Sequence, residues 1–422
     1  MPHAFMELIE RVIRQNPWWH GRRIEEIANL KARNLYHQIL KRINDKQIIS
    51  IVGLRRVGKS TLLYQFIEHL LQETDAKKIL YFSFDEILGK DPEIIERILD
   101  LYEEEIIKDE LSNVYVFFDE INHVKDWQVI LKRYYDGAKI KFFVSGSSSI
   151  FLRKAKESLA GRIFEFELHP LDFKEYLYLK GIRIQDPIIN QATIKKEMNN
   201  FFLNGSFPEI IMEDNVEKIR DYVKSIIEKI IFYDIPAVFD IERPELLKEI
   251  FEVIARNPGS LIEYKKFASA FNITYQTASK YISYLEKAFL IRLLYNYRGS
   301  PIASARKSKK AYLSAHCSAW AYTSMDDFNS LLPKLIENIA VAQLNAKFFW
   351  RKYYEVDIYH NHSLIEVKYR ERPDIKGALE TAKELKARKL IVITKDLDTK
   401  KSTESIEITY IPLWKWLFFM PQ

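Results

Sequence analysis

The stretch that decides the fold is residues 53–61, which read Gly53-Leu54-Arg55-Arg56-Val57-Gly58-Lys59-Ser60-Thr61. The spacing G-x-x-x-x-G-K-[ST] is that of a loop that binds phosphate groups. Glycines let such a loop turn tightly, so that its backbone N–H groups point at phosphate oxygens. The apolar run IISIVG precedes the loop, and a helix pattern follows it, so a helix N-terminus would face the same anion. We therefore expect all nine residues to bind ATP, with Lys59 reaching the β- and γ-phosphates and Ser60 ligating Mg²⁺.

A second apolar run, residues 113–118, ends in two acidic residues, Asp119 and Glu120. Carboxylates at the tip of an apolar strand need a partner, because burying them unpaired is costly. In a Walker B arrangement, Asp119 would hold the Mg²⁺ shell and Glu120 would orient or deprotonate the attacking water. The two motifs together predict an ATPase.

Two further residues are candidates for the same chemistry. Ser147 follows the strand pattern KFFVSG and would sense the γ-phosphate, although a simple serine turn explains the same letters. Arg162 is a candidate arginine finger that stabilises transition-state charge. The alternative for Arg162 is a surface ion pair with Glu165 or Glu167. If Arg162 acts on a neighbouring copy, activity would require oligomerisation.

Four continuous apolar runs alternate with helix patterns: IISIVG, ILYFSF, VYVFFDE and IKFFVSG. Such runs are typical of parallel strands that are buried on both faces in an α/β fold. The segments GLRRVGKST, VYVFFDEINHVKDW, FFVSGSSS, LAGRIFEFELHPLDFKEY and GSFPEI occur in the order found in AAA+/STAND-related P-loop ATPases, which are abundant in archaea, and the chain resembles this family. The resemblance implies additional strands between the two Walker elements and a glutamate beside the Walker B aspartate.

Changes of pattern predict five segments. These are an N-terminal helical segment (1–45), a P-loop ATPase core (46–170), a helical lid (171–245), a winged helix (246–300) and a small α/β restriction-endonuclease-like domain (301–422).

The last segment contains a predicted hairpin with an acidic face. Residues 353–369 alternate around Asn361-His362, and a two-residue turn there would place Asp357 opposite Glu366. Facing Cβ atoms lie about 4.5–5.5 Å apart, so two carboxylates in these positions repel unless a cation lies between them or one keeps a proton. A second Mg²⁺, or Mn²⁺, would satisfy both, and Lys368 would stabilise a developing phosphorane.

This hairpin is similar to the D…E-x-K arrangement of the restriction-endonuclease-like fold. The resemblance implies that Glu337, on the preceding helix, is a further acidic ligand. A solvated hairpin with a Glu355–Lys368 pair is the alternative, and it would make the domain inactive.

The order of three helices and a strand between residues 246 and 297 is that of a winged helix, whose third helix usually enters the major groove of DNA. A basic stretch without acidic residues follows it. The candidate DNA-binding residues are Gln276, Thr277, Lys280, Arg298, Arg306, Lys307, Lys309 and Lys310. The alternative is a helical domain that relays the state of the ATPase, with a solvated basic loop.

Composition limits the remaining possibilities. The chain has 422 residues, a mild net charge of +6 and one cysteine, Cys317, which excludes an internal disulfide framework and suits a reducing compartment. No signal peptide or membrane span is expected, so we expect a soluble cytoplasmic protein without a membrane partner. Two functions stay open: an ATPase coupled to DNA binding or processing, and an ATP-driven regulatory switch that acts on a protein partner.

Overall fold

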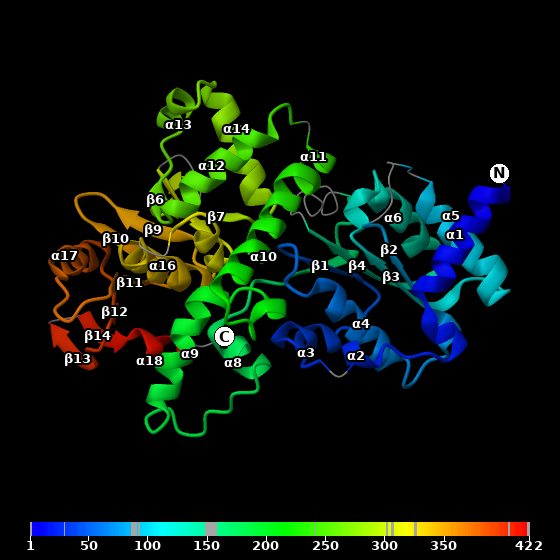
Figure 1. The fold of residues 1–422 in the computed structure, drawn as a ribbon, viewed down its shortest axis with the longest axis horizontal. Coiled ribbons are helices and arrows are strands. Elements are labelled where there is room, and N and C mark those ends of the chain that lie inside the picture. Colours follow the sequence, from blue (N-terminus) through cyan, green and yellow to red (C-terminus); the bar gives the residue numbers. More distant parts are fainter. Residues whose placement is uncertain are drawn as a thin grey trace. The chain divides into compact units, whose positions relative to one another are not determined.

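The structure is a computed structural model that describes residues 2–28, 30–85, 91, 93–147, 158–239, 241–300, 303–304, 308–324, 327–403 and 406–419. The chain forms two compact units (Figure 1). The first comprises Met1–His169, Pro236–Asp240 and Lys287–Phe289. The second comprises Pro170–Ile235, Ile241–Glu286 and Leu290–Gln422.

The first unit contains a parallel five-stranded sheet in the order β2-β3-β4-β1-β5. Its strands are β1 (Ile48–Val52), β2 (Ile79–Ser83), β3 (Ser112–Asp119), β4 (Lys139–Gly146) and β5 (Ile163–Glu167). The predicted α/β class and parallel sheet are therefore confirmed for this unit. Strand β4 lies between β1 and β3, so an additional strand does separate the two strands that carry the Walker motifs, as the resemblance implied.

Helices cover the sheet of the first unit because its strands are apolar on both faces. The helices are α1 (Pro2–Gln15), α2 (Glu25–Ala28), α3 (Asn34–Leu40), α4 (Lys59–Leu70), α5 (Ile94–Leu101) and α6 (Trp127–Gly137). Helices α1, α5 and α6 contribute Val12, Ile98 and Leu131 to one buried cluster with the strands. Helix α4 packs through Phe66, whose ring lies 5.7 Å from that of Phe143 on β4.

The second unit contains a nine-stranded mixed sheet in the order β13-β14-β12-β11-β10-β9-β7-β8-β6. Its strands are β6 (Ser260–Leu261), β7 (Ile291–Asn296), β8 (Lys309–Leu313), β9 (Phe348–Arg351), β10 (Glu355–His360), β11 (Ser363–Lys368), β12 (Lys389–Thr394), β13 (Thr399–Thr403) and β14 (Ile406–Pro412). Its helices include α8 (Phe173–Leu179), α9 (Gln191–Asn204), α10 (Val216–Lys229), α12 (Pro244–Arg256), α13 (Tyr264–Ala270), α14 (Tyr275–Lys287), α16 (Phe328–Gln343), α17 (Lys376–Leu385) and α18 (Leu413–Phe419).

Helices α12, α13 and α14 followed by strand β7 occur in the order on which the winged-helix prediction depends, with the short strand β6 between α12 and α13. Strand β8 pairs with β7 and β6 in antiparallel fashion, and β7 pairs with β9 in parallel. One sheet therefore continues across residue 300, where two separate domains were expected. The division into five segments otherwise stays a prediction.

Candidate active site

The loop after β1 has the backbone shape that its glycines predict. Gly53 has φ 151°, and a Cβ atom built there would lie 2.2 Å from the carbonyl oxygen of Leu168. Gly58 has φ 102° and immediately precedes α4. Both backbone conformations are strained for residues with side chains, so the two glycines fix the path of the loop.

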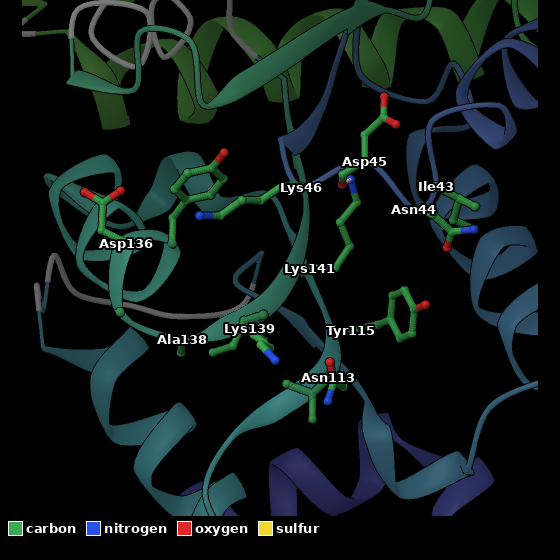
Figure 2. Close-up of a pocket in the computed structure, with 14 residues that line it drawn as sticks. Ile43, Asn44, Asp45, Lys46, Asn113, Tyr115, Asp136, Ala138, Lys139 and Lys141 are labelled. Atoms are coloured by element: carbon green, nitrogen blue, oxygen red, sulfur yellow. Dashed lines mark hydrogen bonds between the residues drawn. The ribbon is translucent and has the colours of Figure 1, made fainter.

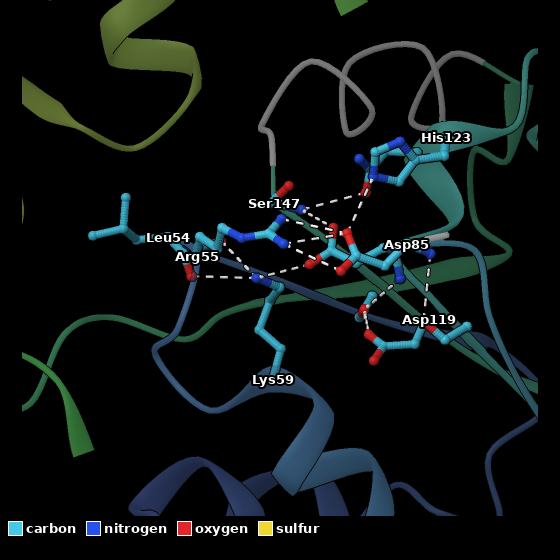
Figure 3. A network of polar contacts seen from close by, with 12 residues as sticks. Leu54, Arg55, Lys59, Asp85, Asp119, His123 and Ser147 are labelled. Carbon is cyan, nitrogen blue, oxygen red and sulfur yellow. Dashed lines mark hydrogen bonds and ion pairs between the residues drawn. The ribbon is translucent and has the colours of Figure 1, made fainter. Parts of the chain in front are cut away.

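Lys59 begins helix α4, and its side chain is almost completely buried. Its Nζ atom donates to the carbonyl oxygens of Gly53, at 3.1 Å, and of Leu54, at 3.2 Å. The same atom lies 3.3 Å from Oε1 of Glu120 (Figure 3). The predicted phosphate-binding lysine and the predicted catalytic glutamate are thus brought together.

Asp119, the last residue of β3, is held by hydroxyl groups from its neighbouring strands. The Tyr81 hydroxyl donates to its Oδ2 atom at 2.9 Å, and the Ser145 hydroxyl donates to Oδ1. Burial and the nearby Glu120 raise the pKa of Asp119, whereas hydrogen bonds from Ser145, Ser60 and Tyr81 partly lower it. A divalent cation beside Asp119 and Ser60 would stabilise the ionised carboxylate, so these two residues fit the predicted Mg²⁺ site.

Glu120 follows directly and adopts a left-handed conformation, with φ 50°. Its backbone N–H donates to Ser145 Oγ at 3.0 Å, and its Oε2 atom accepts from the N–H of Ser147 at 3.1 Å. The Ser147 hydroxyl is buried and has no hydrogen-bond partner in the described part of the chain. Ser147 therefore lies at the predicted site and retains an unused polar group there.

Sequence reasoning missed three residues of this network, namely Tyr81, Ser145 and Asp85. Asp85 follows strand β2 and forms an ion pair with the loop residue Arg55, with Nη2 at 3.1 Å from Oδ2 (Figure 3). All three lie in or directly after parallel strands near their carboxyl ends. That position is the signal that would have found them, because ligand sites of α/β sheets gather at this edge.

Arg162 lies elsewhere. It directly precedes β5, and its guanidinium group makes two hydrogen bonds to Asp136, at 2.9 and 3.1 Å. Strands β5 and β1 are parallel, so Arg162 lies at the edge where strands begin, opposite the edge that carries Lys59. A role of Arg162 at its own chain's loop is therefore wrong, and the predicted surface pair forms with Asp136 rather than with Glu165 or Glu167. Action on a second copy stays a prediction.

A pocket of about 410 Å³ lies at that same opposite edge (Figure 2). Asn113, Lys139 and Lys141, from the starts of β3 and β4, line it together with Asp45 and other residues. Lys141 donates to the carbonyl oxygens of Asp45 and Gln47, and burial lowers its pKa to about 8. The ammonium group of Lys141 is thus hydrogen-bonded to backbone carbonyl groups of the protein itself. The pocket is separate from the nucleotide site.

In the second unit, the predicted hairpin forms with the predicted register. Ile358 pairs with Ile365 and His360 with Ser363, so Asp357 and Glu366 face each other. Asp357 is 8% exposed and Glu366 is 4% exposed. Burial is the main cause that raises the pKa of both carboxyl groups. A solvated hairpin is therefore excluded for these two residues.

The other members of the predicted nuclease-like site are nearby but paired within the protein. Lys368 lies 2.5 Å from Oε1 of Glu366, which differs from the expected pair with Glu355. Glu337, on α16, accepts a hydrogen bond from the Tyr312 hydroxyl at 2.5 Å. Among the residues that the structure describes, no group of three or more acidic, histidine or cysteine side chains has an arrangement that holds a metal ion.

The structure describes only part of the basic stretch that was predicted to bind DNA. Lys310 is only 3% exposed and forms ion pairs with Glu337 and Glu355, so its assignment to DNA binding is wrong. Arg298 donates to the carbonyl oxygen of Arg351, and Lys309 lies over the ring of Tyr295. Arg306 and Lys307 lie outside the described residues. Gln276 and Lys280 are exposed on α14, whereas Thr277 is half-buried.

The fold and the loop geometry of the first unit define a P-loop ATPase fold. A model of the AAA domain family matches residues 45–177, which include this sheet and loop. A second model, for a domain of unknown function (DUF8612), matches residues 195–316.

Three relatives have sequences similar to this chain. MJ1637 of Methanocaldococcus jannaschii, an uncharacterized protein, is 29% identical over 297 residues, which are 63% of this chain and 60% of that protein. MJ1544 of the same organism, also uncharacterized, is 28% identical over 426 residues, which are 93% of this chain and 92% of that protein. An uncharacterized protein of Haemophilus influenzae is 28% identical over 271 residues, which are 61% of this chain and 65% of that protein. The chain thus spans less than two thirds of the length of two of them.

Two solved structures are also similar. The Walker-type ATPase PABY2304 of Pyrococcus abyssi has a TM-score of 0.46 at 15% identity, covering 71% of this chain and 97% of that chain. The ORC1 protein of Aeropyrum pernix, in complex with DNA, has a TM-score of 0.36 at 12% identity, and the match covers 72% of this chain and 95% of that chain. Across the part of this chain that the structure describes, no helix has both the length and the apolar composition required to cross a bilayer.

Proposed function

We propose that the first unit binds ATP with Mg²⁺ and hydrolyses it. The observation that carries this proposal is the convergence of three charged side chains at the carboxyl edge of the sheet. Lys59 comes from the start of α4, and Asp119 and Glu120 come from the end of β3. A chance glycine turn would not bring a buried lysine into contact with a strand-end carboxylate in this way.

Each residue has a distinct role in the proposed reaction. The loop N–H groups and Lys59 bind and orient the phosphates, and Ser60 and Asp119 would hold Mg²⁺, which supplies positive charge next to the phosphates. Glu120 positions the attacking water or accepts its proton, and the Ser147 hydroxyl is available to the γ-phosphate. Arg55 and Asp85 brace the loop beside them.

The test is steady-state phosphate release by the purified protein with ATP and Mg²⁺. Lys59→Ala should abolish turnover, because the phosphates lose their main cation. Lys78→Ala, which removes an exposed lysine from the same unit, is the matched control and should leave turnover unchanged. Equal turnover by wild type and Lys59→Ala would refute the assignment of the site.

Coupling of this cycle to DNA is the second part of the proposal. The supporting observation is the winged-helix order of α12 to β8, with Gln276 and Lys280 exposed on α14. In that motif the third helix reads the major groove, and cationic residues bind phosphates in a salt-dependent manner. The alternative is a regulatory switch, in which the ATP state changes the binding of a protein partner.

Turnover measured with and without single- and double-stranded DNA, at several salt concentrations, separates these alternatives. Coupling to DNA predicts stimulation that declines as salt rises and that weakens in Lys280→Glu. Lys218→Glu, at a residue whose side chain is exposed on α10, is the control for added negative charge. Turnover that is indifferent to every DNA would favour the switch.

A further inference from the structure

The strongest observation outside the nucleotide site is a lysine among the acidic residues of the hairpin. Lys310 lies on β8, between β7 and β6, and only 3% of its surface is exposed. Its Nζ atom lies 2.8 Å from Oε1 of Glu355, 3.0 Å from Oε1 of Glu337 and 3.8 Å from Oδ1 of Asp357. Three carboxylates from α16 and β10 thus surround one ammonium group.

This arrangement is too specific for a surface ion pair. A buried ammonium group costs several kcal/mol in lost hydration, so it persists only where close carboxylates compensate for that loss. Burial alone would lower the pKa of Lys310, but Glu337, Asp357 and Glu355 outweigh burial and raise it. The carboxylates of Glu337 and Glu355, 3.0 and 2.8 Å from Nζ, favour the charged form of the lysine.

We propose that Lys310 is the built-in cation of the hairpin site, so that its ammonium group takes the place that a divalent metal ion would require among Glu337, Glu355 and Asp357. The site then holds no metal ion and does not catalyse metal-dependent phosphodiester cleavage. This inference concerns the second unit and does not depend on the proposed ATPase activity.

Competition for the same oxygens is the first argument. Mg²⁺ binds its oxygen ligands at about 2.1 Å in near-ideal octahedral geometry, so each coordinating oxygen must direct a lone pair at the ion. Oε1 of Glu337 already accepts from both Lys310 and the Tyr312 hydroxyl. A divalent ion bound to the same carboxylates would also lie within a few ångström of the ammonium charge, where the like charges repel strongly at low dielectric.

The second argument is that Lys310 lies in a strand with a neighbour on each side. Strand β8 is hydrogen-bonded on both sides, and the ammonium group lies 5.5 Å from the centroid of the Phe349 ring. The remaining acidic residue, Glu366, has its own cation in Lys368. Each buried carboxylate of the cluster therefore has a cationic or hydroxyl partner from the protein itself.

The test is Mn²⁺ binding to the full chain without nucleotide, measured by electron paramagnetic resonance. Wild type and Asp357→Asn should bind the same number of Mn²⁺ ions. Lys310→Met keeps the side-chain length and removes the charge, and it should gain one Mn²⁺ ion that wild type does not bind. The double variant Lys310→Met/Asp357→Asn should lose this ion. Lys309→Met, the neighbouring lysine on β8, should bind Mn²⁺ as wild type does.

A Mn²⁺ ion that wild type binds and Asp357→Asn loses would overturn the proposal. So would a Lys310→Met variant that gains no ion although its circular dichroism and its urea unfolding show that it is folded. If Lys310→Met does not fold, wild type is compared with Asp357→Asn and with Glu355→Gln, which changes a more exposed residue. This comparison still shows whether wild type holds a Mn²⁺ ion at these carboxylates. Equal Mn²⁺ counts in these three proteins support the built-in cation.

Discussion

At the scale of single residues, His316 is a buried titratable group whose environment favours one protonation state. Its Nε2 atom lies 2.7 Å from the carbonyl oxygen of Phe201, and its Nδ1 atom lies 3.2 Å from Ser206 Oγ. The ring therefore donates to the carbonyl and accepts from the serine as a neutral imidazole. Burial lowers its pKa from 6.5 to about 4, although the bond to Phe201 opposes this shift.

This depressed pKa predicts that acid destabilises the second unit. Below pH 6.5 the unfolded chain takes up a proton at His316, whereas the folded chain does not until about pH 4. The contribution of neutral His316 to the free energy of unfolding is thus fully present above pH 6.5. As the pH falls to 4, the free energy of unfolding decreases by roughly 2–4 kcal/mol. This loss of stability can be measured by urea unfolding at pH 7 and pH 4.5, with hydrogen exchange in the second unit as the probe.

His316→Gln should lose less stability between these two pH values than wild type does, because the titrating group is gone. His362→Gln, at an exposed turn position, should keep the wild-type pH dependence. Parallel curves for wild type and His316→Gln would show that other groups cause the acid response.

The sequence predicted single residues well where a motif fixes them and poorly where only charge was visible. Lys59, Asp119 and Glu120 lie together because a complete motif specified their strands and loop. Lys310 was assigned to DNA because it belongs to a basic run. Strand β8 is buried along most of its length, so no alternation of polar and apolar residues marks which lysine points inward.

At the scale of elements, the junction of β1 and the loop depends on one glycine. A Cβ atom at Gly53 would meet the main-chain oxygen of Leu168, and because the backbone fixes the position of both atoms, a rotamer change cannot separate them. Gly53→Ala should therefore displace the loop and weaken ATP binding by about 5- to 150-fold, since strained backbone costs about 1–3 kcal/mol. Titration with a fluorescent ATP analogue would measure the loss.

Gly21→Ala is the matched control for this prediction. Gly21 also has a positive φ, 73°, but a Cβ atom built there meets no atom within 4 Å. It should reduce stability slightly without changing ATP affinity. Equal affinities for the two variants would show that the contact with Leu168 does not set the loop.

Elements were predictable where one local rule specified them. The hairpin register is correct because Asn361 and His362 both adopt positive φ, as a two-residue turn requires. Strand β5 did not appear among the apolar runs. It is an edge strand that carries Glu165 and Glu167, so it is half-buried and lacks the continuous apolar pattern of β1.

At the scale of the whole molecule, the division into two units makes a prediction about nucleotide binding. A ligand that binds only the folded first unit stabilises it by about 2.7 kcal/mol at a concentration of 100 times its Kd. Mg²⁺ with a non-hydrolysable ATP analogue should therefore slow hydrogen exchange in β1, β3 and β4. Lys59→Ala should show no such protection, and neither should Mg²⁺ alone. Unchanged exchange in these strands of wild type would contradict the proposed site.

The continuous sheet of the second unit has a consequence for how the protein can be divided. A fragment that ends at residue 300 would retain β7 but lose its partners β8 and β9, leaving both sides of an apolar strand with unpaired backbone groups. Such open strands pair readily with other chains, so this fragment would be prone to aggregation. Strand β7, which follows α14, and the hairpin of β10 and β11 therefore belong to one sheet that such a cut would break.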